Sequence, residues 1–284
     1  MKKFISVVLC MVLIVTSFAI SVSAEEKLSY LVLGDSIAYA SGVKNAKEAC
    51  YGKIVADTNG YEYSNYAVPG HTTTNLINRL SEEAVSDAVE NADIISISIG
   101  GNDFLMNNII GLMYDSIVKN DYSKFDDIAE SFYNNFSRII DIINEKNEDA
   151  VILMQTLYNP QSGYLRAPYQ QGADRINNAI NRYAQENPGE IVIVDVATAL
   201  GDDPENFAGD NIHPSVKGNE IIADVVLEKL SEIKLGNTTQ AVISEKGQDI
   251  EISPIFASIF NIYGVVFHII SVIRNFVLNI IPIG

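Results

Sequence analysis

The sequence predicts an α/β protein, a three-layer α/β/α sandwich around a mostly parallel, five-stranded, flavodoxin-like sheet. Short apolar runs alternate with longer amphipathic segments through most of the chain, which is typical of parallel strands joined by helices. Most of the short runs are also apolar almost without interruption, as expected of strands that are covered by helices on both faces. About two hundred residues are enough to bury one core of this kind.

Five strands and two strongly amphipathic helices define the predicted domain, which covers residues 25–235. The predicted strands are Leu28–Leu33, Tyr61–Val68, Asp93–Ile99, Ala150–Thr156 and Ile191–Val196. One apolar helix face consists of Ile128, Phe132, Phe136, Ile139, Ile140 and Ile143, and another of Ile221, Val225, Val226, Leu230 and Ile233. Residues three and four apart share one side of a helix, so these faces are expected to pack on the sheet.

Both ends of the chain differ from this domain in composition. Two lysines, an apolar stretch and the small residues Val22-Ser23-Ala24 open the chain, which is typical of a secretory signal peptide over residues 1–24. An N-terminal membrane anchor is the alternative, although the apolar run is barely long enough to span a bilayer. Residues 236–251 form a polar linker, and residues 252–284 form a hydrophobic tail. We expect an exported protein, either extracellular or held at the cell surface through this tail.

The chain is strongly acidic and has few cysteines. Loss of the signal peptide leaves 17 basic residues against 36 acidic ones, a net charge of −19. Nucleic acid and anionic lipid would repel such a chain, so we expect no nucleic-acid partner. Cys50 would be the only cysteine left, which excludes an internal disulfide. We interpret Cys50 as a small buried apolar residue.

Polar, glycine-bearing loops follow four of the predicted elements. They are Gly34-Asp35-Ser36, Pro69-Gly70-His71-Thr72, Gly100-Gly101-Asn102-Asp103 and, before the last helix, Gly209-Asp210-Asn211-Ile212-His213-Pro214. Ligands of open parallel sheets bind beyond the carboxyl ends of the strands. The sequence therefore predicts a functional site at this edge of the sheet, and the loops Gly111–Tyr122 and Pro160–Tyr169 are expected to shape its pocket.

Ser36 and His213 are the candidate nucleophile and base. A serine hydroxyl becomes reactive when a neighbouring base takes its proton, and histidine is the usual base near neutral pH. His213 follows Asp210 by three residues, a spacing that allows the carboxylate to orient the imidazole. His71 has no carboxylate near it in sequence, and His268 lies in the apolar tail. The simpler interpretations are that Ser36 caps a helix and that Asp210 merely ends a loop.

The same loops resemble the signature motifs of the SGNH (GDSL-type) hydrolases. Gly34-Asp35-Ser36, Gly70, Gly100-x-Asn102-Asp103 and Asp210-x-x-His213 stand in the order and approximate spacing of that family, from Leu28 to about Ile233. Ile37 stands where the short name of the family has leucine.

The resemblance implies a role for each matching residue. Ser36 would be the nucleophile, His213 the general base and Asp210 the residue that orients it. The backbone N–H groups of Ser36 and Gly70, with the Asn102 amide, would form the oxyanion hole. The resemblance also implies ester substrates, such as lipid acyl esters or acetylated carbohydrates, and no metal or organic cofactor. From the residues themselves, Asn102 could equally be a turn residue, and Asp103 is interpreted as a cap of the following helix.

Two other functions compete with an exported serine esterase or lipase. A metal-dependent phosphoesterase would use Asp35, Asn102, Asp103, Asp210 and His213 as metal ligands. Such sites usually contain more histidines and bridging carboxylates than these loops offer. A membrane-tethered binding domain without turnover is the third function, and the intact set of serine, aspartate and histidine argues against it.

The tail leaves three interpretations open. Ile252 to Ile273 are 22 residues without a formally charged side chain, and roughly 20 apolar residues span a bilayer as a helix. The polar residues gather on one stripe: Ser258, Asn261, His268, Ser271, Asn275 and Asn279. Such a helix could lie in a membrane interface, span the membrane, or pack on its own catalytic domain. The first two predict membrane contact through Ile252–Ile281.

Overall fold

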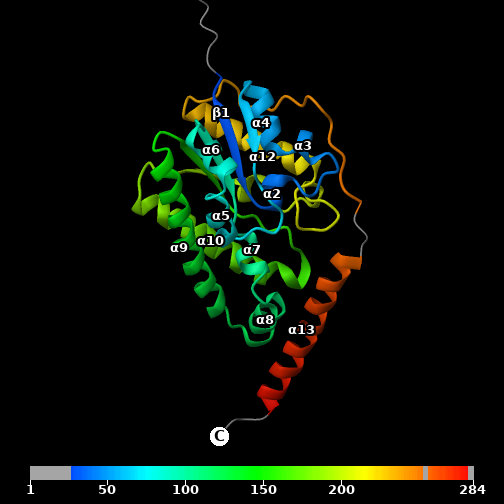
Figure 1. The fold of residues 1–284 in the computed structure, drawn as a ribbon. Helices are drawn as coiled ribbons and strands as arrows, with labels where there is room; N and C mark the ends of the chain where they lie inside the picture. The colour runs from blue at the N-terminus through cyan, green and yellow to red at the C-terminus, as the bar shows by residue number, and fades with distance from the viewer. Residues whose placement is uncertain (1–26, 252–254, 281–284) are drawn as a thin grey trace, which may run out of the picture.

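The computed structural model describes residues 27–251 and 255–280, and a five-stranded parallel sheet lies at its centre (Figure 1). The strands are β1 (Ser29–Gly34), β2 (Glu62–Asn65), β3 (Ile94–Ser98), β4 (Val151–Gln155) and β5 (Val192–Val194). They lie in the order β2-β1-β3-β4-β5, and every neighbouring pair is parallel. This is the flavodoxin-like order. The predicted fold class and the five predicted strands are therefore confirmed.

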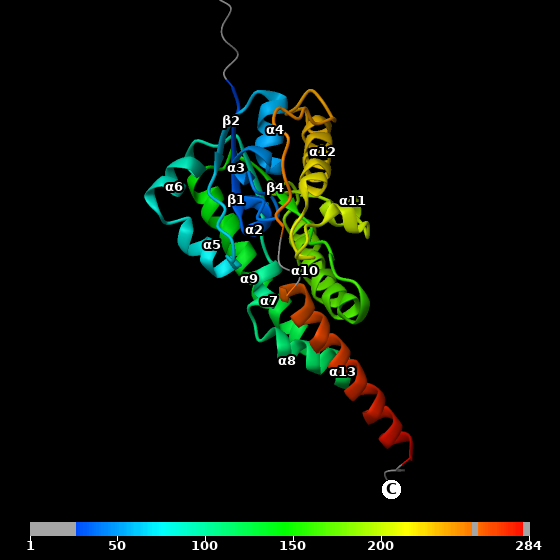
Figure 2. The same cartoon turned by 90° about the vertical axis from the view of Figure 1, so that its right-hand side faces the viewer.

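Helices cover both faces of the sheet and complete the three layers (Figure 2). One face carries α5 (Thr73–Arg79), α6 (Glu83–Glu90), α9 (Ser123–Lys146) and α10 (Arg166–Glu186), and the other carries α2 (Ser36–Tyr39), α4 (Tyr51–Asn59), α11 (Val196–Leu200) and α12 (Val216–Glu232). Alternate residues of β1 enter the two cores: Leu31 and Leu33 pack with the first set of helices, Tyr30 and Val32 with the second. This division follows from the two-residue period of a strand.

Shorter elements connect these layers. They are α3 (Ala46–Ala49), α7 (Gly101–Leu105), α8 (Ile109–Tyr114), the π-helical turn η1 (Asp115–Lys119), the 3₁₀ turns η2 (Gly163–Leu165) and η3 (Pro204–Asn206), and the C-terminal α13 (Ile255–Ile280). The sequence 111–122, predicted as a loop, is mostly helical, because α8 and η1 continue one another. The helix α13 extends away from the sheet at the end of the molecule that carries α8 (Figures 1 and 2). Over the described residues, none of the helices is long and apolar enough to cross a membrane.

The two predicted apolar helix faces differ in how completely they are buried. All six apolar residues of the α9 face are buried. In α12, Val226 and Leu230 are buried as predicted, whereas Ile221 and Val225 are only partly buried and Ile222 is fully buried. The sequence has adjacent apolar pairs at these positions, so periodicity alone could not decide which member of each pair faces the sheet.

Gly34 allows β1 to end where the functional loops begin. Its φ of +134° lies in a region that side chains rarely adopt. A Cβ built on it would lie 2.0 Å from the carbonyl oxygen of Ser98 on β3. The next residue, Asp35, donates its N–H to that same oxygen at 3.0 Å. The close approach of β1 and β3 therefore requires glycine here, and it sets the direction in which Ser36 leaves the sheet.

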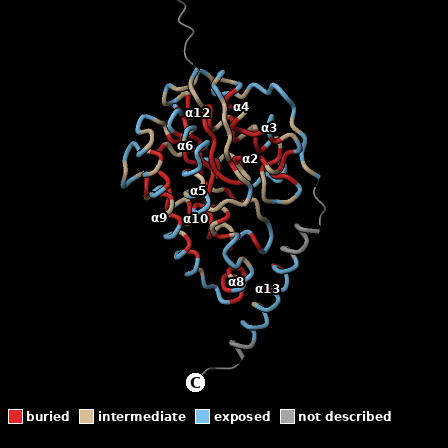
Figure 3. The backbone as a smooth tube through the Cα atoms, viewed as in Figure 1, coloured by how far each residue is buried: buried red, intermediate tan, exposed pale blue. Residues whose placement is uncertain are grey.

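Residues 236–251 run along the outside of the domain and contact it at several points (Figure 3). The N–H of Lys44 donates to Gln248 O at 2.8 Å, and the N–H of Ile250 donates to Gly42 O at 3.0 Å. The Asp249 carboxylate also accepts the N–H of Val216 at 2.7 Å, at the first turn of α12. Residues 236–251 are therefore attached to the domain at several points. The predicted signal peptide, residues 1–24, lies outside the described residues.

Candidate active site

The polar loops meet at the carboxyl edge of the sheet around one cavity, which we call the catalytic cavity. Its volume is about 390 Å³, and its lining includes Ser36, Gly70, Asn102 and His213. Asp210 contacts His213 and lines a neighbouring cavity. The structure therefore brings together the five residues that the sequence suggested for the site.

Ser36 is the first residue of α2 and is not its cap. Asp35 occupies the N-cap position, and its Oδ1 accepts the N–H of Ile37 at 2.9 Å. The hydroxyl of Ser36 makes no hydrogen bond with another described side chain or backbone group. The capping function that the sequence left open for Ser36 thus belongs to its neighbour, and the serine hydroxyl is left to face the cavity.

His213 is held by both oxygens of Asp210. The imidazole Nδ1 lies 2.5 Å from Asp210 Oδ2. The other oxygen, Oδ1, accepts the backbone N–H groups of Ile212 and His213, each at 3.0 Å. A hydrogen bond from Nδ1–H to the carboxylate leaves Nε2 without a proton, which is the tautomer that a general base requires. Tyr158 steadies the same loop, because its hydroxyl donates to Ile212 O at 2.8 Å.

The same contacts set the charge of Asp210. Partial burial alone would raise its pKa, but the hydrogen bonds from the His213 ring and from the backbone N–H groups outweigh burial and lower the pKa. The carboxyl is therefore ionised through the neutral range. An ionised carboxylate beside Nδ1 stabilises the imidazolium that forms when His213 takes a proton.

Three hydrogen-bond donors line the catalytic cavity opposite this pair. The Asn102 amide donates one N–H to the carbonyl of His71 at 2.9 Å, which fixes the amide and leaves its second N–H available. The backbone N–H groups of Ser36 and Gly70 make no hydrogen bond within the described residues. Gly70 has a φ of +83°, a left-handed conformation that favours glycine. Such an arrangement suits an oxyanion, which needs several preorganised donors.

The other two histidines lie outside this arrangement. His71 contributes its backbone carbonyl to Asn102, while its ring Nδ1 is buried with no partner among the described residues. Burial, with help from nearby Arg79 and against the influence of Glu82, lowers the pKa of His71. His268 lies on α13, where its ring stacks on Tyr164 with centroids 4.2 Å apart. Neither residue lines the catalytic cavity that contains Ser36.

Asp103 differs from its predicted role. It lies inside α7, so it does not cap that helix. Its carboxylate accepts the backbone N–H of Thr73 at 3.1 Å and the Thr73 hydroxyl at 2.5 Å. The hydroxyl of Thr73 in turn accepts the amide of Asn135 at 2.9 Å. Asp103 therefore ties the start of α5 to α7, and this tie holds the loop of Gly70 beside Asn102.

The residues of the metal alternative do not converge on a common centre. The carboxylate of Asp210 binds His213, that of Asp103 binds Thr73, and the Asn102 amide binds a backbone carbonyl. Across residues 27–251 and the described part of α13, no group of three or more potential ligand side chains is arranged to hold a metal ion.

A second cavity, which we call the apolar cavity, adjoins the catalytic cavity. The two share the lining residues Leu105, Ile109, Tyr169 and Ile212. The rest of the apolar cavity is formed by Phe104, Met113, Phe125, Gln161, Leu165, Pro168, Asp210 and Asn211. Both segments that were expected to shape the pocket contribute to this wall. Its other members, from α7 and the start of α9, were missed, because their sequence pattern is also that of ordinary core helices.

A parallel α/β/α sandwich with a serine, a histidine–aspartate pair and preorganised N–H donors at its carboxyl edge defines an ester hydrolase of the serine class. A model of the GDSL-like lipase/acylhydrolase family matches residues 32–221, well over half of the chain, and the chain belongs to this family.

Similar proteins agree with this assignment. The spore germination lipase LipC of Bacillus licheniformis is 26% identical over 209 residues, which is 69% of this chain and 93% of that protein. The uncharacterised protein YpmR of Bacillus subtilis strain 168 is 23% identical over 223 residues, 73% of this chain and 83% of that protein. The crystal structure of the lipase Lip_vut3 from a goat rumen metagenome has the same fold, with a TM-score of 0.61 and 23% identity over 74% of this chain and 99% of that chain.

Proposed function

We propose that the protein is an exported serine esterase or lipase that hydrolyses a carboxylic ester through an acyl-enzyme on Ser36. The observation that carries the proposal is the placement of Ser36 and of His213, fixed by Asp210, around one cavity with three N–H donors. Each component supplies one requirement of acyl transfer: a nucleophile, a base in the correct tautomer, and donors for the developing negative charge.

The acylation step moves one proton and breaks one ester bond. His213 Nε2 takes the proton from Ser36 Oγ as this oxygen attacks the ester carbonyl carbon. The negative charge that forms on the carbonyl oxygen is held by the N–H groups of Ser36, Gly70 and Asn102. Collapse of this intermediate expels the alcohol oxygen, which takes the proton from His213 and leaves as the alcohol.

Deacylation repeats these steps with water as the nucleophile. His213 removes a proton from water, the hydroxide oxygen attacks the acyl carbon, and Ser36 Oγ leaves. The proton on His213 returns to Ser36, and the carboxylic acid is released. Throughout the cycle Asp210 remains ionised and keeps Nδ1–H in place.

The substrate we favour is a lipid acyl ester, in preference to an acetylated carbohydrate. The apolar cavity opens onto the catalytic cavity through shared lining residues, and most of its side chains are aromatic or aliphatic. The tyrosines that a sugar ring could use already make other contacts: Tyr158 bonds the His213 loop, Tyr164 stacks on His268, and Tyr169, which lines both cavities, packs edge-to-face on Phe104. The name of the Bacillus licheniformis relative, a spore germination lipase, points in the same direction.

Labelling with a fluorophosphonate tests the nucleophile. This reagent forms a covalent bond with an activated serine, so Ser36→Ala is expected to abolish labelling and to reduce esterase activity by at least about a thousandfold. Ser41→Ala serves as the control, because Ser41 is another serine of the cavity lining. This variant is expected to be labelled like wild type, since it retains Ser36. Undiminished labelling of Ser36→Ala would show that the proposed mechanism is wrong.

The location of the enzyme is part of the proposal. The pattern of residues 1–24 supports export, with the mature chain beginning at Glu25. N-terminal sequencing of protein recovered outside the cytoplasm checks this: a chain that still begins at Met1 would contradict cleavage. We also propose that α13 contacts a lipid surface, and the exposed residues of that helix, considered below, support this contact.

A further inference from the structure

The outer wall of the apolar cavity is supported from behind by α13. Met113 of α8 and Leu165 of η2 line the cavity. The same two side chains form a buried cluster with Val118 of η1 and Phe267 of α13. Phe267 is 8% exposed, whereas the preceding residue, Val266, is 43% exposed. The helix α13 therefore inserts one aromatic ring behind the wall, and Met113 and Leu165 separate this ring from the cavity.

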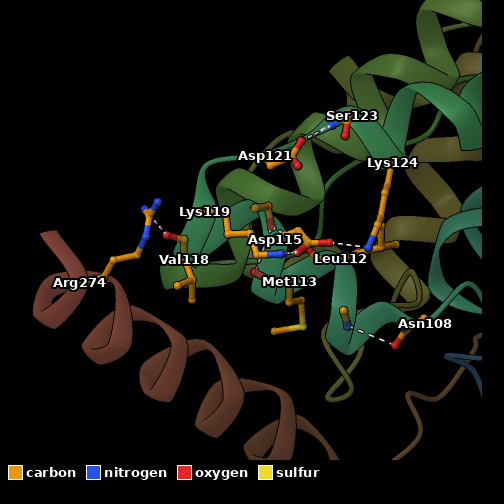
Figure 4. A network of polar contacts seen from close by, with 12 residues as sticks. Asn108, Leu112, Met113, Asp115, Val118, Lys119, Asp121, Ser123, Lys124 and Arg274 are labelled. Atoms are coloured by element: carbon orange, nitrogen blue, oxygen red, sulfur yellow. Dashed lines mark hydrogen bonds and ion pairs between the residues drawn. The ribbon is translucent and has the colours of Figure 1, made fainter. Parts of the chain in front are cut away.

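Polar and aromatic contacts fix α13 in this position. The Phe267 ring packs edge-to-face on Tyr114, with centroids 5.7 Å apart, and His268 stacks on Tyr164. Arg274 donates from Nη1 to Val118 O at 2.9 Å (Figure 4). That carbonyl lies in the last turn of η1, where carbonyl groups have no donor within the helix. The helix α13 is thus attached to α8 and η2 through the adjacent residues Phe267 and His268, and to η1 through Arg274 about two turns further on.

The wall segment formed by α8 and η1 depends on such contacts. It is bounded by two asparagines with left-handed backbone, Asn108 (φ +44°) and Asn120 (φ +54°). Asp115 pairs within the segment with Lys119 at 2.7 Å, and it attaches the segment to α9 of the domain by its pair with Lys124 at 2.5 Å (Figure 4). On the other side the segment rests on α13. The position of Met113 in the cavity wall is therefore set between these two attachments.

We propose that α13 is a specificity element of the esterase site, in which Phe267 limits the length of the acyl chain that the apolar cavity accepts. This inference rests on the proposed function. The cavity holds about 60 Å³, against about 390 Å³ for the catalytic cavity, so a small displacement of its wall changes its depth by a large fraction. The family match ends at residue 221, and α13 adds this limit from outside the matched region.

The binding of free fatty acids tests the proposal without requiring turnover. Dissociation constants are measured by calorimetry for saturated fatty acids from butyrate to palmitate, on the full chain and without membranes. In Phe267→Ala, Met113 and Leu165 lose their support and can move outward. In wild type, affinity is expected to increase with each added methylene up to a limiting chain length. In Phe267→Ala this limiting length is expected to increase by about two carbons, and the affinity for fatty acids longer than the wild-type limit is expected to rise roughly tenfold.

Two matched variants make the result specific. Val266→Ala removes a neighbouring exposed side chain of α13 and is expected to leave the chain-length profile unchanged. Arg274→Gln removes the bond to Val118 O while keeping Phe267, so it applies the same test if Phe267→Ala does not fold. A profile that is unchanged in both Phe267→Ala and Arg274→Gln overturns the proposal, and so does an equal loss of affinity at every chain length.

The proposed esterase activity is tested by a different measurement. Hydrolysis of a butyryl ester, the shortest acyl chain of the series, reports on the machinery around Ser36. It is expected to be the same in wild type and in Phe267→Ala. Failure of wild type to hydrolyse any ester would therefore refute the esterase, while the fatty-acid profile would still decide the role of α13.

Discussion

Asp35 performs a structural task immediately beside the proposed nucleophile. Its side chain is 3% exposed, and its Oδ1 fixes the first turn of α2 by accepting the N–H of Ile37. Burial raises the pKa of Asp35 to about 7, although the Ile37 N–H and the charge of His213 oppose this rise. The carboxyl is therefore protonated in acid and costs free energy when it ionises inside the folded chain.

Replacement of Asp35 by asparagine is expected to stabilise the protein at alkaline pH. The folded-state pKa of about 7 lies above the ordinary value of 3.8, so the contribution of Asp35 to stability is complete below about pH 4 and is lost as pH rises towards 7. Asparagine keeps an oxygen for the Ile37 N–H and cannot ionise. The free energy of unfolding of Asp35→Asn, relative to wild type, is expected to be up to about 4 kcal/mol more favourable at pH 8 than at pH 4.

Urea denaturation at both pH values measures this difference. Asp103, whose pKa burial also raises, is present in both proteins and cancels in the comparison. If the difference in unfolding free energy between Asp35→Asn and wild type is the same at pH 4 and pH 8, the raised pKa of Asp35 is contradicted.

The side chains of the candidate site were predictable from the sequence, whereas a backbone group that positions one of them was not. Ser36, His213 and Asp210 are side chains whose type and spacing indicate their chemistry. The partner that orients Asn102 is the backbone carbonyl of His71, and every residue has such a carbonyl. Sequence therefore drew attention to the ring of His71, whereas the structure uses its main chain.

Among the elements, the tie between α5 and α7 connects fold to site. Thr73, the first residue of α5, bonds Asp103 of α7 and Asn135 of α9. The loop of Gly70 leads directly into α5, and Asn102 lies in α7. The spacing of two of the three proposed oxyanion donors thus depends on Thr73, whose hydroxyl and backbone N–H both donate to Asp103, together with the bond from Asn102 to His71 O.

Thr73→Val is expected to reduce kcat more than it raises KM for a short-chain ester. Valine has nearly the shape of threonine but lacks the hydroxyl, so Asp103 loses a donor and α7 can shift. Loss of oxyanion geometry is expected to reduce kcat by about 10- to 100-fold, and the lost hydrogen bond to cost about 1–3 kcal/mol of stability. Thr74→Val is the control, because Thr74 also accepts Asn135 but does not contact Asp103. Equal kinetic effects in the two variants would exclude this role for the tie.

At the same scale, strands were easier to predict than helix placement. Most of the strands coincide with nearly continuous apolar runs, which were enough to identify the sheet, whereas the edge strand β2 is polar and only partly buried. The helix α8 and the turn η1 are different, because they are short and contain Gly111. Their contacts with α13 and with Lys124 come from distant parts of the chain, which a local pattern does not contain.

At the scale of the whole molecule, α13 presents two unlike sides. Gly264, Phe267, His268 and Ser271 are turned towards the domain. The exposed apolar residues are Ile262, Val265, Val266, Ile269, Ile270, Val272, Ile273 and Phe276. Of the polar stripe, His268 stacks on Tyr164 and Ser271 is half-buried, whereas Asn275 is exposed. The exposed apolar side is a candidate surface for contact with lipid.

This arrangement predicts binding to uncharged lipid. The net charge of −19 expected after export opposes anionic membranes, so burial of apolar surface must drive the contact. The full chain is expected to float with phosphatidylcholine vesicles, to bind anionic vesicles less well, and to bind no more weakly in high salt. Val265→Asp/Ile269→Asp is expected to abolish flotation. Val242→Asp/Ile243→Asp adds the same charge at exposed sites in residues 236–251 and is expected to float like wild type. Flotation of both double variants would argue against lipid binding by the apolar side of α13.

The attachment of residues 236–251 along the domain limits how far α13 can travel. Ile250 is bonded to Gly42, and an added Cβ on Gly42 would lie 3.2 Å from the Cβ of His213. Ile255 follows Glu251 by four residues, so their Cα atoms can be at most about 14 Å apart. A helix released from α8 would stay near the catalytic edge at a local concentration in the millimolar range. Soluble competitors for its place behind the cavity wall would therefore have to reach comparable concentrations, whereas a membrane could draw the helix away without its leaving the enzyme.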